Sequence, residues 1–273
     1  LSRWAPGRKW IGGTGVRPDW ARLIPEQLRP LGYRAYHSGK WHIDGKPTEN
    51  GFDRSYHIKR LDSFFYATAH DKDDVPLQPT EPDSGFFATI AVADHAIERL
   101  QEHAREHSGR PFFHYLAFFA PHFPLHALAE DIARYRDRYL EGWDKMRQER
   151  HARQRQLGIV DTDLSALEPD IGPPYKFPDQ IAQLGPGEIN RPIPWKQLND
   201  EQRRFQTTKM AIHAAMVDRL DREIGRVLDQ LREMDALDNT VIMFLSDNGA
   251  SAEMMVRGCG HDPALPMGSN GTY

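Results

Sequence analysis

The sequence has one cysteine, no long apolar run and little net charge, and each of these shortages excludes a class of protein. Cys259 is the only cysteine among 273 residues, so neither an internal disulfide nor a cysteine-based zinc site can form. No apolar stretch approaches the ~18 residues of a transmembrane helix, and the first ten residues, LSRWAPGRKW, lack the apolar core of a signal peptide. The net charge of -4 argues against a partner that is a nucleic acid.

The residues that are present predict a folded α/β domain. Near-continuous apolar runs at 112–119 (FFHYLAFF) and 239–246 (NTVIMFLS) are typical of strands buried on both faces, and residues 33–37 form a third predicted strand. Apolar residues recur at helical spacing over 88–106 and 211–234. Strands that alternate with helices predict a mainly parallel central sheet flanked by helices on both faces.

We expect one domain over residues 1–273, interrupted by an insertion at about residues 136–194. The insertion starts with the charged run DKMRQERHARQRQ, and a tract rich in proline and glycine follows it. This composition predicts a solvated helix followed by an irregular loop.

Polar side chains follow each of the three predicted strands. Lys40 and His42 stand in SGKWH, His122 in APHFPLH, and Asp247 and Asn248 in SDNG. Sites in open α/β sheets gather beyond the carboxyl ends of the strands. We therefore expect these loops to converge on one site.

Each motif has a chemical interpretation and a structural one. Asp247 and Asn248 offer oxygen ligands to a hard cation such as Ca²⁺, but an Asp-Asn-Gly sequence is also an ordinary turn. Lys40 and His42 supply a cation and a proton carrier for a tetrahedral oxyanion, or Lys40 is a surface residue beside a packed tryptophan. His122, stiffened by flanking prolines, is an oriented imidazole or a satisfied polar residue.

Taken together, the blocks GYRAYHSGKWHIDG, APHFPLHA, MVDRLDREIGRVL and DNTVIMFLSDNG resemble the formylglycine-dependent sulfatases of the alkaline phosphatase superfamily. The resemblance implies a sulfuric ester hydrolase that cleaves a small-molecule or carbohydrate sulfate ester. It implies that Asp247 and Asn248 bind a single Ca²⁺, that Lys40 and His122 bind the sulfate ester, and that Lys40, His42 and His122 are catalytic. It also implies a periplasmic or secreted enzyme.

The chain departs from the family pattern at the nucleophile. The family makes formylglycine from Cys or Ser in a Cys/Ser-x-Pro-x-Arg motif; Ser2 and Arg3 have the wrong spacing and Cys259 lies in RGCGHD. We therefore expect the central part of a catalytic domain, truncated at both ends, with formylglycine in a missing upstream segment and no activity in the fragment as given. The alternatives are a phosphonate or phosphate ester hydrolase of the same superfamily and a catalytically silent anion-binding fragment.

Overall fold

The computed structural model describes residues 20–170, 185, 187–189, 191–250, 262 and 264–272. The chain divides into two compact units: unit 1 consists of Leu1–Ala120 and Arg219–Ile242, and unit 2 of Pro121–Asp218 and Met243–Tyr273. The segment that carries Ser2 and Arg3, and the segment around Cys259, lie outside the described residues.

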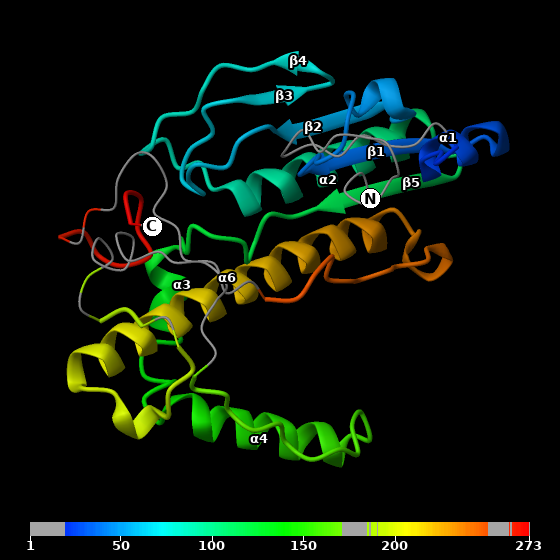
Figure 1. Cartoon of the computed structure of the whole chain (residues 1–273). Coiled ribbons are helices and arrows are strands. Elements are labelled where there is room, and N and C mark those ends of the chain that lie inside the picture. The colour runs from blue at the N-terminus through cyan, green and yellow to red at the C-terminus, as the bar shows by residue number, and fades with distance from the viewer. Residues whose placement is uncertain are drawn as a thin grey trace. The chain divides into compact units, whose positions relative to one another are not determined.

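Unit 1 is built on a five-stranded sheet with the strand order β4-β3-β2-β1-β5 (Figure 1). β1 lies parallel to both of its neighbours, and Tyr36 pairs with His114 on one side and with Arg54 on the other. β3 runs antiparallel to β2, and β4 runs antiparallel to β3. The strands are β1 (Arg34–Gly39), β2 (Arg54–Ile58), β3 (His70–Lys72), β4 (Val75–Pro76) and β5 (Phe112–Ala117), and a 3₁₀ turn at Thr48–Asn50 precedes β2.

The expected α/β fold is confirmed, and the sheet is mixed rather than mainly parallel. The antiparallel part arises at a tight hairpin, where Asp73 and Asp74 connect β3 to β4 with φ angles of 52° and 63°. Positive φ at both central residues matches the twist of a two-residue hairpin, and aspartate tolerates this conformation. Strands of only two and three residues leave no periodic signal in a sequence.

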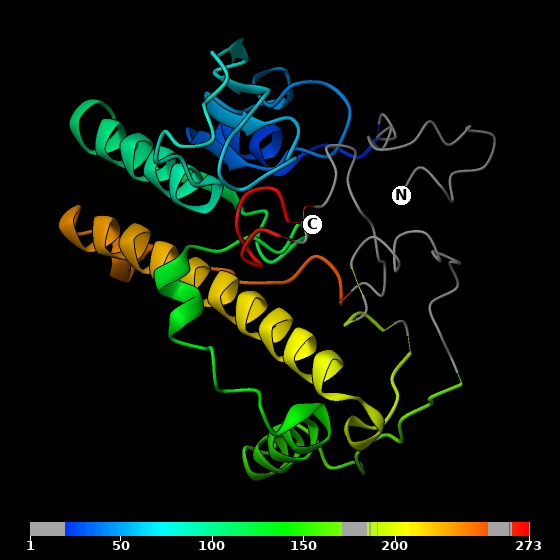
Figure 2. The same cartoon turned by 90° about the vertical axis from the view of Figure 1, so that its left-hand side faces the viewer.

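One face of the sheet is covered by α2 (Ala88–Glu106), whose bounds match the predicted helix. Its buried side chains include Val92, Ala96 and Leu100 at four-residue steps. Part of this surface packs against Val227 and Leu231 in α6 (Asp200–Glu233). α2 and the last turns of α6 lie side by side in both views (Figures 1 and 2).

The other face is covered by a cluster of Ala35, Trp41 and Phe52, with Leu23 packed against it. Leu23 precedes the short helix α1 (Ile24–Leu28), which continues as a 3₁₀ turn over Arg29–Leu31. Gly32 ends this helical segment at φ 86°, as the sequence predicts.

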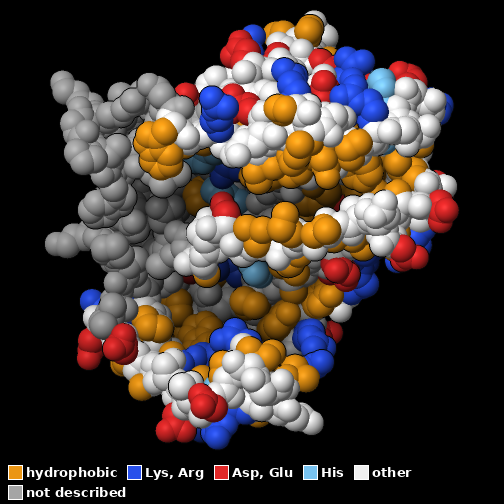
Figure 3. All heavy atoms as spheres, turned by 90° about the vertical axis from the view of Figure 1, so that its right-hand side faces the viewer, with side chains coloured by type: hydrophobic (Ala, Val, Ile, Leu, Met, Phe, Trp, Pro, Cys, Tyr) orange, Lys and Arg blue, Asp and Glu red, His pale blue; other side chains and the backbone are white. Residues whose placement is uncertain are grey.

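The predicted strand at residues 239–246 is not a strand in this structure. A 3₁₀ turn at Leu237–Asn239 leads into a run without regular secondary structure from Val241 to Leu245, whose side chains are between 51% and 87% exposed. Figure 3 shows hydrophobic side chains reaching the surface on the face that it presents. A strand requires a neighbour that accepts its backbone hydrogen bonds. No described strand pairs with this run, so its apolar composition does not produce one.

Unit 2 contains α3 (Ala129–Ala133), α4 (Gly142–Gln156), a 3₁₀ turn at Trp195–Gln197 and the first part of α6. α4 confirms the solvated helix predicted in the insertion. α6 begins eleven residues before the predicted helix, at a reciprocal cap: Asn199 Oδ1 accepts the Gln202 N–H at 2.9 Å, and Gln202 Oε1 accepts the Asn199 N–H at 3.0 Å.

No helix in the described ranges has both the length and the apolar character needed to cross a bilayer.

Candidate active site

Lys40 stands directly beyond the carboxyl end of β1, where the backbone is locked against β5. Gly39 has φ 117°, and a Cβ placed on it would lie 2.0 Å from the carbonyl oxygen of Ala117. The Lys40 N–H donates to that same oxygen at 2.8 Å. Glycine is therefore required for the two strand ends to approach this closely. The contact fixes the point at which the half-buried Lys40 side chain leaves the sheet.

The loop after Lys40 is held by two buried rings. Trp41 donates from Nε1 to the carbonyl oxygen of Gly45 at 2.9 Å, and His37 Nε2 contacts the carbonyl oxygen of Lys40 at 3.1 Å. Burial lowers the pKa of His37 to about 4, so this ring is a neutral support. His42 is exposed between these anchored positions. His37 was not predicted as part of the site, although it is the residue that lies beneath the lysine.

His122 is an exposed ring whose two nitrogens have different roles. Its Nδ1 lies 2.6 Å from the carbonyl oxygen of Phe123. The centroids of the His122 and Phe123 rings lie 4.4 Å apart. Because a carbonyl can only accept, Nδ1 carries the proton. In the neutral ring, Nε2 is then the nitrogen that can accept a proton. In the charged ring, the N–H group at Nε2 is the one that can donate a proton to a neighbouring molecule.

His126, four residues later, has a structural role. Its side chain is fully buried and Nε2 contacts the carbonyl oxygen of Thr272 at 2.6 Å. Burial lowers the pKa of His126 to about 4. Of the two histidines in this loop, only His122 has a ring that is open to solvent.

Asp247 and Asn248 lie in an exposed bend of unit 2. The Ser246 hydroxyl donates to the carbonyl oxygen of Asn248 at 2.7 Å, and Asn248 Nδ2 donates to the carbonyl oxygen of Gly249 at 2.7 Å. With its nitrogen engaged, the amide of Asn248 offers its oxygen as the metal-binding atom. Carboxylate and amide oxygens suit Ca²⁺, and this pair could supply two of the roughly 6–8 ligands that Ca²⁺ takes.

The predicted site residues are divided between the two units. Lys40 and His42 belong to unit 1, whereas His122, Asp247 and Asn248 belong to unit 2. Lys40 and the Ala117 carbonyl lie together at the ends of the parallel strands β1 and β5. The convergence of all three loops stays a prediction.

A second polar cluster in unit 1 was not predicted from the sequence. The Ser38 hydroxyl lies 2.7 Å from His95 Nδ1 in α2 and 3.0 Å from His114 Nε2 in β5. His95 Nε2 and His114 Nδ1 are buried without a hydrogen-bond partner in the described structure. Ser38 lies one residue from His37, so the two side chains point to opposite faces of the sheet.

A group of potential metal ligands at Glu102, Glu106 and His107 does not match the predicted calcium site. Glu102 is buried and is already paired with Arg99 and Arg54. The group also contains an imidazole nitrogen, whereas Ca²⁺ is bound by oxygen. We assign no metal to it.

The fold and the loop after β1 define an α/β protein that presents a cation and a proton carrier at the end of a parallel strand. The family model described as Sulfatase matches residues 9–268. The chain therefore belongs to the sulfatase family.

Two curated relatives and one solved structure illustrate the match. The chain is 31% identical to an uncharacterized sulfatase of Schizosaccharomyces pombe, over 89% of this chain and 44% of that protein. It is 28% identical to the arylsulfatase of Klebsiella aerogenes, over 85% of this chain and 48% of that protein. The chain thus spans about half the length of these relatives.

The solved structure shares the fold at 17% identity. It was determined in complex with its substrate D-glucosamine-2-N,6-O-disulfate and aligns over 85% of this chain and 50% of that one, with a TM-score of 0.54.

Proposed function

We propose that this chain is part of an enzyme that hydrolyses a sulfate ester, either of a small molecule or of a carbohydrate. The observation that carries the proposal is the sulfatase family match over residues 9–268, which includes the locked strand end that carries Lys40. The name of the Klebsiella aerogenes relative, arylsulfatase, supports the same reaction class.

In the proposed reaction, the S–O bond to the alcohol breaks, water provides the new oxygen on sulfur, and a proton reaches the departing oxygen. The proposal includes one Ca²⁺ ion, bound in part by Asp247 and Asn248, and a formylglycine that the printed sequence does not encode in its usual motif. When present, these groups polarise the sulfate and supply the nucleophile.

The residues of this chain bind the anion and move protons. The Lys40 ammonium group neutralises charge on the sulfate oxygens, which is worth most where water is excluded. His122 donates a proton from Nε2 to the leaving oxygen, since its Nδ1 is already engaged by the Phe123 carbonyl. His42, exposed in the loop beside Lys40, moves the proton that accompanies sulfate release.

The test uses the protein encoded by the complete coding sequence and two substrates with the same leaving group, 4-nitrophenyl sulfate and 4-nitrophenyl phosphate. We expect a higher kcat/KM for the sulfate. Lys40→Ala lowers it by on the order of 10²–10³-fold, the usual effect of removing an oxyanion-stabilising group. Lys46→Ala is the matched control, because Lys46 is exposed in the same loop.

Faster turnover of the phosphate ester would favour the phosphatase alternative. No turnover of either ester would favour a silent anion-binding protein. An unchanged kcat/KM for the sulfate in Lys40→Ala would refute the role given to Lys40.

A further inference from the structure

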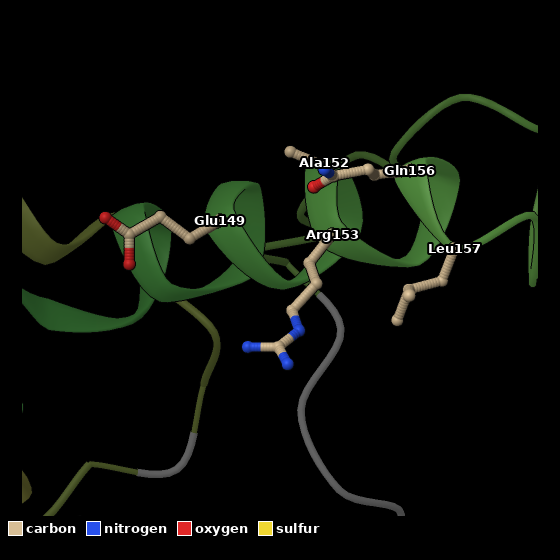
Figure 4. A pocket seen from close by; sticks show the side chains of 5 residues that line it. All are labelled: Glu149, Ala152, Arg153, Gln156 and Leu157. Carbon is tan, nitrogen blue, oxygen red and sulfur yellow. The ribbon is translucent and has the colours of Figure 1, made fainter.

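A small open cavity in unit 2 is bordered by three segments of the predicted insertion, and none of the predicted site residues lines it. Its volume is about 270 Å³. It is lined from α4, from the loop after α4 and from the segment before the 3₁₀ turn at Trp195–Gln197 by Trp143, Arg147, Leu167, Ile189, Arg191 and Pro192. The larger hollow of about 610 Å³ that Figure 4 shows is lined by one helix and the residue after it, from Glu149 to Leu157. The smaller cavity is the one to which several chain segments contribute.

The aromatic wall of this cavity is fixed in place. The Trp143 indole donates from Nε1 to the carbonyl oxygen of Ile193 at 3.1 Å and meets the Trp195 ring edge-on, with ring centroids 4.8 Å apart. The Trp195 N–H is held by Asp144 Oδ2 at 2.9 Å. A Cβ on Gly142 would lie 2.1 Å from the Trp195 ring, so glycine permits this packing. A wall ordered in advance reduces the entropy lost on binding.

Two arginines give the cavity a positive rim. Arg147 donates to the carbonyl oxygen of Ser165 at 2.6 Å, and Arg191 is exposed. Neither guanidinium has a carboxylate partner among the residues that the structure describes. The aliphatic parts of arginine side chains can line an apolar surface while their charged ends stay in water. An occupant that matches this wall is apolar at one end and anionic at the other.

We propose that this cavity binds a single aromatic ring that carries an anionic group. The ring contacts Trp143, and the anion pairs with the guanidinium groups of Arg147 and Arg191. The volume lies slightly below the roughly 300–1,000 Å³ of sites for drug-sized ligands, so it suits one ring rather than an oligosaccharide. The site does not depend on sulfate ester hydrolysis.

Three non-hydrolysable probes separate the two features of the ligand. Benzenesulfonate has a ring and a charge, methyl phenyl sulfone has the ring alone, and methanesulfonate has the charge alone. Ligand-observed NMR titrations of the 273-residue chain should give a Kd on the order of 1 mM for benzenesulfonate, as expected for a ligand of this size. The other two probes should bind at least about fivefold more weakly, because each lacks one of the paired interactions.

Single substitutions test the location. Arg191→Gln should weaken benzenesulfonate binding about fivefold and Arg147→Gln about tenfold, because Arg147 is the more buried cation. Arg153→Gln is the matched control, since Arg153 lies on α4 but lines the hollow in Figure 4. Far-ultraviolet circular dichroism checks that each variant is folded.

Several results would overturn the proposal. Equal binding of methanesulfonate would mean attraction to a basic helix, and equal binding of methyl phenyl sulfone would mean a purely apolar cavity. Wild-type affinity in both Arg147→Gln and Arg191→Gln would place any benzenesulfonate site elsewhere.

Discussion

Acidification should unfold unit 1 because three of its histidines are enclosed in the neutral form. Burial lowers the pKa of His37 to about 4, of His114 to about 3 and of His95 to about 2. His114 as a whole is half-buried, but its Nδ1 is fully enclosed. The nearby charges add to the effect, since Arg99 and Lys72 both oppose protonation of His95.

The direction of the effect follows from proton binding. In the unfolded chain each histidine takes up a proton near pH 6.5, whereas in the folded chain these three stay neutral until about pH 4 or below. The unfolded state therefore binds more protons between these limits. The free energy of unfolding is highest above pH 6.5 and decreases as the pH falls through this window.

The magnitude is large compared with the stability of an ordinary domain. Once the pH is well below 6.5, each histidine lowers the free energy of unfolding by about 1.4 kcal/mol per pH unit. The three together lower it by about 4 kcal/mol per pH unit. Between pH 7 and pH 5 the loss is about 2 kcal/mol for each histidine and about 6 kcal/mol in total. Domains are stable by roughly 5–15 kcal/mol, so this loss is between about two-fifths and all of the stability of an ordinary domain.

Urea unfolding of the 273-residue chain at half-unit steps from pH 7 to pH 5 measures this slope. His95→Asn keeps a polar atom near the position of Nδ1, which contacts Ser38, and removes the titrating ring. It should reduce the slope by about 1.4 kcal/mol per pH unit at pH values well below 6.5. The control is His122→Gln, because His122 is exposed to water in the folded chain. Constant stability across this range, or an unchanged slope in His95→Asn, would show that these histidines are not buried as described.

Four further predictions concern the core and the site. Gly39→Ala should lower the free energy of unfolding by roughly 1–3 kcal/mol from backbone strain alone. Urea unfolding measures this loss, and the control is Gly109→Ala, whose Cβ would meet no atom within 4 Å. Leu100→Ala should lower the free energy of unfolding by about 2–5 kcal/mol, since Leu100 is 1% exposed between α2 and α6; a loss below about 1 kcal/mol would contradict that packing. In the full-length protein, His122→Ala should slow alkyl sulfates by on the order of 10²–10⁴-fold and aryl sulfates far less, because a stable leaving anion needs little protonation; rates that fall equally for both would exclude the acid role. Asp247→Ala should weaken Ca²⁺ binding to the full-length protein in a calorimetric titration, and an unchanged affinity would remove Asp247 from the ligand set.

The sequence predicts elements whose signal is local. α2 is predicted with the observed bounds because its apolar residues recur at helical spacing over the whole helix. α6 begins earlier than predicted, although Asn199 and Gln202, three residues apart, already form a capping pattern that marks its start. The apolar periodicity starts later than the cap, so the cap is the better indicator of where α6 begins.

Parts of the site depend on contacts that a sequence does not show. Lys40 is predicted, but the reason for its fixed position is the approach of Gly39 to the Ala117 carbonyl, 78 positions along the chain. The Ser38 cluster joins side chains from β1, α2 and β5, and each of these residues alone has an ordinary polar interpretation. Long-range pairing of this kind becomes visible only when the strand register is known.

Two apolar runs show why composition alone does not determine a strand. β5 and the run from Val241 to Leu245 have the same apolar character, which predicts two central strands, but β5 lies at the edge of the described sheet. β5 forms because it exchanges backbone hydrogen bonds with β1 over six residue pairs, from Arg34↔Phe112 to Gly39↔Ala117. The other run pairs with no described strand and remains exposed. An apolar run therefore indicates that its side chains favour burial, whereas a strand forms only when two chain segments pair through their backbones. Lys40 has a defined place in this structure because its strand has a neighbour on each side, whereas the bend at Asp247 follows a run that pairs with no strand in the described part of the chain.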